Sequence, residues 1–450
     1  MKEITMEQAI KLCKEAEEMT REQRQAAAHE RLKELVAYAK QHSAFYKELY
    51  KDIGDNFTRK QLPPTSKAKL MESYESWVTD PQITYDGVYD YLHNEDTAVK
   101  SYLGKYSALT TSGTTGIPMP MVRDSYHNVI HGALMQTRLL RNVDPDIMEP
   151  KNHRIAAVVM LDPQVSSYSS FLKMARANEQ YKDNLLPISL LKDPDEIARE
   201  LDRFQPDLLT GYPSVMGALA EAQKKGKMNL NLQAIACSAE VLSDKVHQAL
   251  TEAFGCAILN NYCSTEGGEA AMSCDKGKLH INEDWVIIEP VDKDGNPAEP
   301  GTWSQGIYIT DLTNYVQPVI RYFVEDKVRI TYGCQCGSTL PVMEVMGRVL
   351  ENITVGGKVA LSAGAEVETR LKDVTGVYSI QLLQKGERSF EIRMVAEDEE
   401  KKQLAFEDAK ARLIEYFNIL NCGQLEFTLG DEPPKRSAKG GKVKFLEVDF

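Results

Sequence analysis

The stretch with the clearest capacity for chemistry is a run of hydroxyl groups and glycines between Leu109 and Pro118, which contains no charged side chain. Glycines allow the backbone to adopt a positive φ and to approach a ligand closely. Backbone N–H groups and hydroxyls in such a loop can donate hydrogen bonds to the oxygens of a polyphosphate. The run lacks the lysine-containing pattern of a Walker loop, and a flexible surface loop is the competing interpretation. The candidate phosphate-binding residues are Thr111, Ser112, Gly113, Thr114, Thr115 and Gly116.

Two acidic residues stand where a carboxylate could bind a ligand. Glu266 lies in the segment Asn260–Gly268, after a predicted strand, and Mg²⁺ prefers one or two carboxylates together with phosphate oxygens. Asp326 ends the segment Gln317–Asp326, and an ionised side chain there is a strong hydrogen-bond acceptor. The alternative for Asp326 is a surface ion pair with Arg321, which would contribute little to stability.

Three cysteines and one histidine form a separate group. Cys274 precedes His280 by six residues, and Cys334 and Cys336 follow some fifty residues later. Three thiolates and an imidazole are a tetrahedral ligand set for Zn²⁺, and a four-ligand site with no open position is structural. The alternative is that these side chains are small buried residues of the core.

The elements that would position these residues alternate between short apolar strands and helical patterns. This alternation predicts a parallel sheet covered on both faces, and therefore an α/β fold. In such sheets the ligand lies outside the carboxyl ends of the strands. The predicted strands are 155–161, 185–190, 208–212, 234–238 and 257–262, and the predicted helices are 194–204, 214–225 and 243–254.

The two flanks of this α/β part differ from it in character. Residues 5–50 carry apolar side chains at helical spacing, which predicts one or two amphipathic helices. Residues 279–346 are rich in predicted strands and turns. A helix near 401–417 and extended segments near 378–383, 390–395 and 426–429 predict a small α+β unit at the end of the chain. We therefore expect an N-terminal domain of residues 1–346, with a helical lead-in at 1–60 and a β-rich part at 279–346, and a C-terminal domain of residues 347–450.

Composition limits the partners of the protein. Of 450 residues 42% are hydrophobic and 26% are charged, as in ordinary globular proteins, and the formal net charge is −13. We expect no nucleic-acid or membrane partner, because both require a basic surface. The absence of long apolar runs and of a signal peptide predicts a cytoplasmic protein, in which the eight cysteines are reduced. The N-terminal helices could form the interface of a homodimer.

Several of these segments together resemble the adenylate-forming superfamily, the acyl-CoA ligases and their relatives, and within it the phenylacetate–CoA ligase-like subgroup. The resemblance covers the chain from about residue 36 to residue 442, and several sequences of the subgroup have comparable Cys and His positions. The segments that carry it are 36–50, 62–70, the hydroxyl-rich loop, Cys237–Glu240, Asn260–Gly268, Gln317–Asp326, Gly347-Arg348 and Lys435–Lys442.

The chain departs from the family pattern at four positions. Met119 follows the hydroxyl-rich loop where longer acyl-CoA synthetases have a lysine, as is typical of the subgroup. Val241 replaces a proline, Cys263 stands where many members have glycine, and Leu350 follows the hinge motif where acidic residues are common.

The resemblance implies a role for each matched residue. The hydroxyl-rich loop would hold the phosphates of ATP, Glu266 would hold Mg²⁺, and Asp326 would bind the ribose. Lys442, with Lys439 as a competitor, would bridge the substrate carboxylate and the α-phosphate and so reduce charge repulsion. The other residues implied in ATP or AMP binding are Ser238, Ala239, Glu240, Asn261, Tyr262, Ser264, Thr265 and Arg348.

The resemblance also implies a reaction, in which ATP activates a carboxylic acid as an acyl-adenylate before transfer to CoA. ATP, Mg²⁺ and CoA would take part, with a structural Zn²⁺, and an aromatic acid such as phenylacetate is favoured. Tyr212, at a strand end, would contact the acid, and Tyr168 is a second candidate in what we expect to be a loop. The alternatives are an adenylyltransferase that acts on a cofactor or another acceptor, and a nucleotide-binding protein without catalysis.

Overall fold

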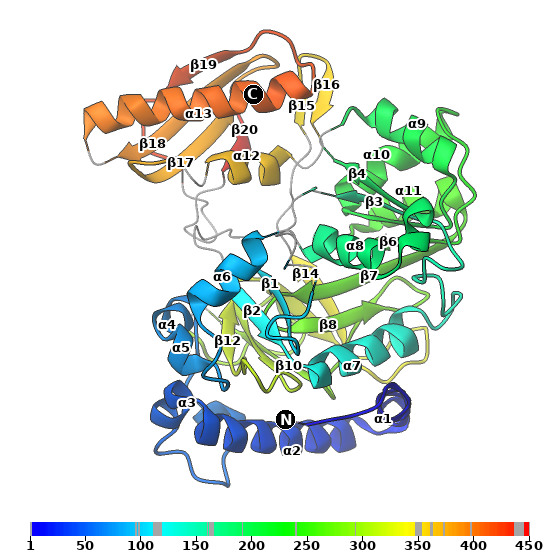
Figure 1. Cartoon of the computed structure of the whole chain (residues 1–450), viewed down its shortest axis with the longest axis vertical. Coiled ribbons are helices and arrows are strands. Elements are labelled where there is room, and N and C mark those ends of the chain that lie inside the picture. Colours follow the sequence, from blue (N-terminus) through cyan, green and yellow to red (C-terminus); the bar gives the residue numbers. More distant parts are fainter. Residues whose placement is uncertain are drawn as a thin grey trace.

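The computed structural model describes most of the chain (Figure 1). Among the described residues, no helix has the length and apolar content needed to cross a bilayer. The described residues are 2–94, 97, 100–110, 119–159, 161, 166–190, 192–238, 241–292, 294–346, 353–360, 363–371, 374–396, 398–435 and 445–449.

A nine-stranded sheet in the order β13-β14-β9-β8-β7-β6-β5-β3-β4 lies at the centre of the structure. The strands from β7 to β4 run parallel to one another, which confirms the predicted α/β class. The strands from β13 to β8 pair antiparallel, so the sheet is mixed, because strands of the β-rich part extend its edge. The bounds are β3 (Ile155–Val159), β4 (Leu185–Ser189), β5 (Leu208–Gly211), β6 (Ala234–Cys237), β7 (Ala257–Ser264), β8 (Gly268–Ser273), β9 (Leu279–Ile281), β13 (Lys327–Thr331) and β14 (Val342–Met346).

Helices connect the parallel strands and cover the sheet. Helix α9 begins at Pro194, where the Asp193 side chain accepts the N–H of Asp195, and α11 ends before Gly255, whose φ of +62° suits a glycine. The apolar sides of α9, α10 and α11 pack with the strands in one buried cluster. The bounds are α8 (Ser166–Ala177), the 3₁₀ helix η3 (Glu179–Asn184), α9 (Pro194–Phe204), α10 (Pro213–Lys224) and α11 (Asp244–Phe254).

The N-terminal residues form three helices, α1 (Met6–Glu18), α2 (Arg21–His42) and α3 (Ala44–Leu49), rather than the one or two expected. The breaks fall where Thr20 and Ser43 adopt extended backbone and accept N–H groups of the next helix. In Figure 1 these helices lie at the end of the molecule opposite the C-terminal residues.

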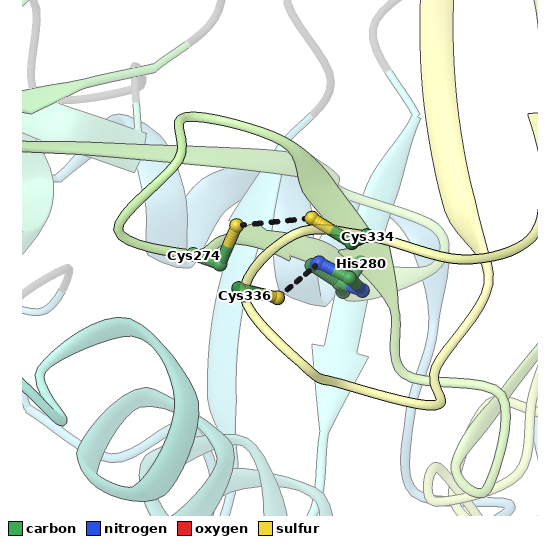
Figure 2. Close-up of side chains that lie close together, drawn as sticks. All are labelled: Cys274, His280, Cys334 and Cys336. Atoms are coloured by element: carbon green, nitrogen blue, oxygen red, sulfur yellow. Dashed lines mark hydrogen bonds between the residues drawn. The ribbon is translucent and has the colours of Figure 1, made fainter.

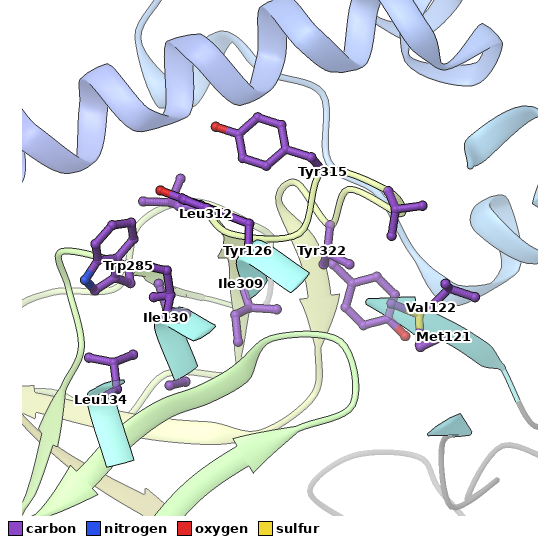
Figure 3. Close-up of a cluster of buried hydrophobic side chains, with 14 of the residues drawn as sticks. Met121, Val122, Tyr126, Ile130, Leu134, Trp285, Ile309, Leu312, Tyr315 and Tyr322 are labelled. Carbon is purple, nitrogen blue, oxygen red and sulfur yellow. The ribbon is translucent and has the colours of Figure 1, made fainter. Parts of the chain in front are cut away.

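A large hydrophobic core joins α7 to a three-stranded sheet in the order β10-β11-β12. Figure 3 shows Tyr126 and Ile130 of α7 beside Trp285 and Ile309. This packing fixes α7 against the end of β11. The bounds are η1 (Arg59–Gln61), α4 (Lys67–Glu72), α5 (Tyr74–Trp77), α6 (Tyr85–His93), β1 (Ser107–Thr110), β2 (Pro120–Arg123), α7 (Ser125–Leu134), the π-helical turn η2 (Met135–Leu139), β10 (Val286–Val291), β11 (Gly306–Asp311) and β12 (Tyr322–Val324).

The C-terminal residues form a four-stranded sheet in the order β19-β18-β17-β20. Their core is separate from the others and is centred on Phe390, whose ring centroid lies 5.1 Å from that of Phe417 and 5.4 Å from that of Phe427. The bounds are β15 (Ile353–Val355), β16 (Lys358–Ala360), α12 (Ala363–Leu371), β17 (Val377–Gln384), β18 (Ser389–Ala396), α13 (Glu399–Ile419), β19 (Glu426–Leu429) and β20 (Leu446–Val448).

Candidate active site

The described candidates for nucleotide binding gather at the carboxyl edge of the parallel strands. Ser238 directly follows β6, while Asn261, Tyr262 and Ser264 belong to the end of β7. Beyond them, Thr265 begins the tight turn that connects β7 to β8. This edge is where ligands bind in open α/β sheets, as the sequence predicts.

The turn between β7 and β8 is held from several sides. The Ser264 hydroxyl accepts the N–H of Gly267 at 2.8 Å, and the Arg123 guanidinium donates to the carbonyl oxygens of Ser264 and Thr265 at 3.2 and 3.0 Å. A Cβ atom at Gly267 would lie 2.1 Å from Ile309 Cδ1, so a larger residue there would have to displace the Ile309 side chain. The backbone around Glu266 therefore has a fixed shape.

Glu266 lies at this turn as a half-buried carboxylate. The hydroxyl of Tyr322, in β12, donates to its Oε1 at 3.1 Å. Burial raises the pKa of Glu266, while the hydrogen bond from Tyr322 and the nearby cations of Lys67 and Arg123 act in the opposite direction. A carboxylate at this edge of the sheet suits Mg²⁺ bound to phosphates, which fits the predicted role.

Asp326 lies between β12 and β13, where the hydroxyl of Tyr262 donates to its Oδ2 at 2.6 Å. Burial and the Asp326 carboxylate raise the pKa of Tyr262 well above its usual range, so the phenol stays a donor. The alternative ion pair between Arg321 and Asp326 is wrong, since Arg321 pairs with Glu289 at 3.1 Å. Asp326 keeps acceptor capacity that could bind ribose hydroxyls.

These two tyrosines and two carboxylates form a reciprocal pair of hydrogen bonds. Tyr262 precedes Glu266 by four residues, and Tyr322 precedes Asp326 by four residues. Each tyrosine donates to the carboxylate of the other segment. The predicted metal ligand and the predicted ribose ligand are thereby joined at one place.

The segment that contains Thr65 and Lys67 also belongs to this site, which the sequence alone does not reveal. Thr65 donates its N–H to the Arg321 carbonyl at 2.9 Å and accepts the N–H of Phe323 at 3.0 Å. Arg321 has an unusual φ of +46°, stabilised by these and other contacts. The bridge holds Tyr322 in place and brings Lys67 within electrostatic range of Glu266.

The four predicted zinc ligands converge, as Figure 2 shows. Their ligand atoms lie within 4.8 Å of one another, with 3.9 Å between the sulfurs of Cys274 and Cys334 and 3.4 Å between Cys336 Sγ and His280 Nε2. A tetrahedral Zn²⁺ with bonds of about 2.3 Å to sulfur and about 2.0 Å to nitrogen would separate these pairs by about 3.8 and about 3.5 Å. His280 Nδ1 lies 3.0 Å from the Leu340 carbonyl, which leaves Nε2 free to bind a metal. The arrangement therefore fits zinc.

The two predicted acyl-pocket residues, Tyr212 and Tyr168, lie in different parts of the structure. Tyr212 follows β5 and is buried in the cluster beneath α9 to α11. Tyr168 lies in helix α8, so the loop expected there is wrong. The roles of both residues remain predictions.

The remaining predicted site residues lie outside the described residues. They are Thr111, Ser112, Gly113, Thr114, Thr115, Gly116, Ala239, Glu240, Arg348, Leu350, Lys439 and Lys442.

Two named proteins are similar to this chain in sequence, whereas no family model matches it. The protein CapK of Staphylococcus aureus is 23% identical over 319 residues, which cover 67% of this chain and 62% of CapK, so the chain spans less than two thirds of that relative. Phenylacetate-coenzyme A ligase of Thermus thermophilus is 24% identical over 362 residues, which cover 76% of this chain and 74% of the ligase.

Solved structures of 2-hydroxyisobutyryl-CoA ligase match 96% of this chain. The structure with 2-HIB-AMP and CoA in the thioesterification state has a TM-score of 0.61 at 18% identity and is covered to 91%. The structure in the postadenylation state has a TM-score of 0.52 at 17% identity and is also covered to 91%. These comparisons agree with the resemblance inferred from the motifs.

Proposed function

We propose that this chain, which has the fold of the adenylate-forming acyl-CoA ligases, uses ATP to activate a carboxylic acid as an acyl-adenylate and transfers the acyl group to coenzyme A. The reciprocal pairing of Tyr262 with Asp326 and of Tyr322 with Glu266 carries this proposal. It places a carboxylate suited to Mg²⁺ beside a carboxylate suited to ribose hydroxyls. A nucleotide with its magnesium ion is a ligand that uses both.

In the proposed reaction the carboxylate of the acid attacks the α-phosphorus of ATP and pyrophosphate leaves. The thiol of CoA then attacks the carbonyl of the acyl-adenylate, and AMP leaves. The chain contributes mainly placement and neutralisation of charge. Glu266 would hold Mg²⁺ against the phosphates, residues 111–116 would bind the phosphates, and Lys442 or Lys439 would approach the reacting carboxylate.

We propose an aromatic acid such as phenylacetate as the substrate. The support is the similarity to a protein named phenylacetate-coenzyme A ligase, at 24% identity. The similar structures belong to a ligase named for 2-hydroxyisobutyrate, a small branched hydroxy acid, so that class of acid is the competing substrate.

We also propose that residues 1–346 and 347–450 act as two domains in this reaction. The separate hydrophobic core of the C-terminal residues supports this division. An ion pair of 3.1 Å between Lys358 of β16 and Asp193, which precedes α9, joins the two parts.

We propose a structural Zn²⁺ at Cys274, His280, Cys334 and Cys336. The four side chains form a closed ligand set, with no position left for a substrate. The ion would connect the loop between β13 and β14 to the start of β9. Metal analysis of the purified protein is expected to find one zinc per chain.

The test of the proposed function is ATP–pyrophosphate exchange with a panel of aryl, branched, hydroxy and medium-chain acids. We expect one class of acid to drive exchange and CoA to release AMP from the loaded enzyme. Asp326→Ala is expected to abolish exchange, while Glu325→Gln, a change at the neighbouring exposed carboxylate, is expected to retain it.

The same assay distinguishes the two candidate lysines. Of the variants Lys439→Ala and Lys442→Ala, only the one that lacks the catalytic lysine should lose ATP–pyrophosphate exchange. Exchange with an acid but no release of AMP by CoA would instead favour another acyl acceptor. Binding of ATP without exchange on any acid would contradict the ligase proposal and favour the cofactor-directed or non-catalytic alternatives.

A further inference from the structure

A series of buried side chains connects helix α7 to the turn that carries Glu266. His131 Nδ1 lies 2.6 Å from Oε2 of Glu269, the third residue after Glu266. On the other side of the ring, His131 Nε2 lies 3.2 Å from the hydroxyl oxygen of Thr313, which donates to Asp311. His131, Thr313 and Asp311 are all buried.

The 2.6 Å separation of His131 Nδ1 from Glu269 Oε2 is an ion-pair contact that a protonated His131 makes, and Nε2 then donates to the hydroxyl oxygen of Thr313. Burial by itself lowers the pKa of His131, but the carboxylates of Glu269 and Asp311 raise it to about 9. In the same pair, burial opposes ionisation of Glu269, yet His131 lowers the pKa of Glu269 to about 2. The two side chains therefore form an ion pair between α7 and β8 at neutral pH.

The group could also be read as a metal site, since ligand atoms of His127, His131 and Asp311 lie within 4.8 Å of one another. The Thr313 oxygen, however, lies 2.8 Å from His127 Nδ1 and 3.2 Å from His131 Nε2. A metal ion bound to both histidines would have to displace this hydroxyl. The described contacts fit a hydrogen-bonded network instead.

The His131 ring also touches the backbone of the turn. Gly268 has a φ of +60°, and a Cβ atom there would lie 2.3 Å from Cε1 of this ring. The N–H of Glu269 points at His131 Nδ1, 3.1 Å away, and donates to it when that nitrogen carries no proton. Gly268 pairs with Ser264 across the turn, so the ring rests on the base of the turn that presents Glu266.

We propose that the ion pair of His131 with Glu269 is a positioning element that holds Glu266 in the orientation required for magnesium-bound ATP. Neither residue needs to touch the nucleotide. His131 acts through the turn backbone, and Asp311 and Thr313 fix the ring from behind. This inference rests on the proposed function, because it assigns Glu266 to the nucleotide's Mg²⁺.

The test compares two ligands by calorimetry, ATP with Mg²⁺ and AMP without it. His131→Gln and Glu269→Gln are expected to weaken binding of Mg·ATP by about 10-fold or more, the usual effect of changing a residue that orients a metal ligand. Binding of AMP should stay within about 2-fold, because Tyr262 and Asp326 are unchanged. In the double variant the two amides can hydrogen-bond to each other, so part of the loss should be recovered.

His127→Gln is the matched control. His127 lies one helical turn before His131, is equally buried and contacts the same Asp311 and Thr313, but no described contact joins it to the turn at Glu266. His127 also stacks on the His131 ring, with 4.0 Å between the ring centroids, so this variant is expected to lower the unfolding temperature and to weaken Mg·ATP binding much less than His131→Gln does. Glu269→Gln preserves side-chain shape, so it provides the test if His131→Gln does not fold.

The outcomes separate the inference from the proposed function. Equal affinities of the wild type and both variants for Mg·ATP would overturn the positioning role and leave the ligase proposal intact. Loss of AMP and Mg·ATP affinity together would show a general structural effect and would also overturn it. A wild-type protein that binds neither nucleotide would refute the proposed function, and the inference with it.

Discussion

Replacement of His131 by glutamine should change how the stability of the protein depends on pH. Burial opposes protonation of His131, but Glu269 and Asp311 raise its pKa from 6.5 to about 9. A raised pKa means that the folded protein binds this proton more tightly than the unfolded chain. The resulting stabilisation is complete below pH 6.5 and is lost as the pH rises through about 9. At about 1.36 kcal/mol for each pKa unit, the change amounts to about 3 kcal/mol.

The assay is urea unfolding followed by tryptophan fluorescence between pH 6.5 and about 9. All three tryptophans, Trp77, Trp285 and Trp303, precede residue 346, so the signal reports on the part of the chain that contains His131. The wild type should lose stability across this range, and the His131→Gln variant should lose about 3 kcal/mol less. Groups whose pKa does not depend on His131 cancel in the comparison.

His127→Gln provides the control for this prediction. Burial, together with the cation of His131, lowers the pKa of His127 to about 4, so this side chain stays neutral throughout the tested range. Its replacement should reduce stability by a constant amount and preserve the wild-type slope. The reasoning would be refuted if the wild type and His131→Gln had parallel profiles, because the proton on His131 would then contribute nothing to folding.

Three further predictions concern other parts of the site. Gly268→Ala should lower the free energy of unfolding, measured with urea, by about 1–3 kcal/mol, which is the cost of a left-handed backbone for alanine. The loss should be larger if the His131 ring cannot move away from the added Cβ atom. Tyr322→Phe removes a hydrogen bond that favours the charged form of Glu266, so the loss of Mg·ATP binding on acidification should move to higher pH in calorimetric titrations. Cys336→Ser should release zinc and lower the unfolding temperature. A chelator should lower the unfolding temperature of the wild type but not that of the variant. If the chelator has no effect on the wild type, the four side chains hold no metal.

The fold could be predicted in large part from local patterns. Strands β3 to β7 are short apolar segments, and helices α9 to α11 between them are amphipathic, so each element can be recognised without its neighbours. The antiparallel extension of the sheet could not be recognised in this way. Its strands are paired by contacts such as Val342 with His280, and no local pattern indicates which strand an edge will accept.

In the candidate site, too, local patterns predict some residues and not others. Glu266 and Asp326 stand in motifs that identify them, and the cysteines can be grouped by their chemistry. The side chains that hold these residues in place could not be predicted, because they come from distant segments of the chain. Arg123 lies 141 residues before Ser264, whose carbonyl it binds, and His131 lies 138 residues before Glu269. Contacts of this kind depend on tertiary packing, which the order of residues does not display.

The reciprocal hydrogen bonds indicate how the two halves of the proposed nucleotide site would act on each other. The hydroxyl of Tyr262 reaches from the Glu266 segment to Asp326, and that of Tyr322 reaches from the Asp326 segment to Glu266. A displacement of a whole segment therefore strains a bond at both carboxylates, whereas a reorientation of the Glu266 side chain alone strains only its bond with Tyr322. Hydrogen bonds to charged groups contribute about 1.5–3 kcal/mol each, so a ligand that orders one carboxylate would favour the bound position of the other by up to that amount. The ribose and the metal-bound phosphates of one nucleotide would then bind cooperatively, whereas AMP, which lacks the metal, would use only half of this coupling.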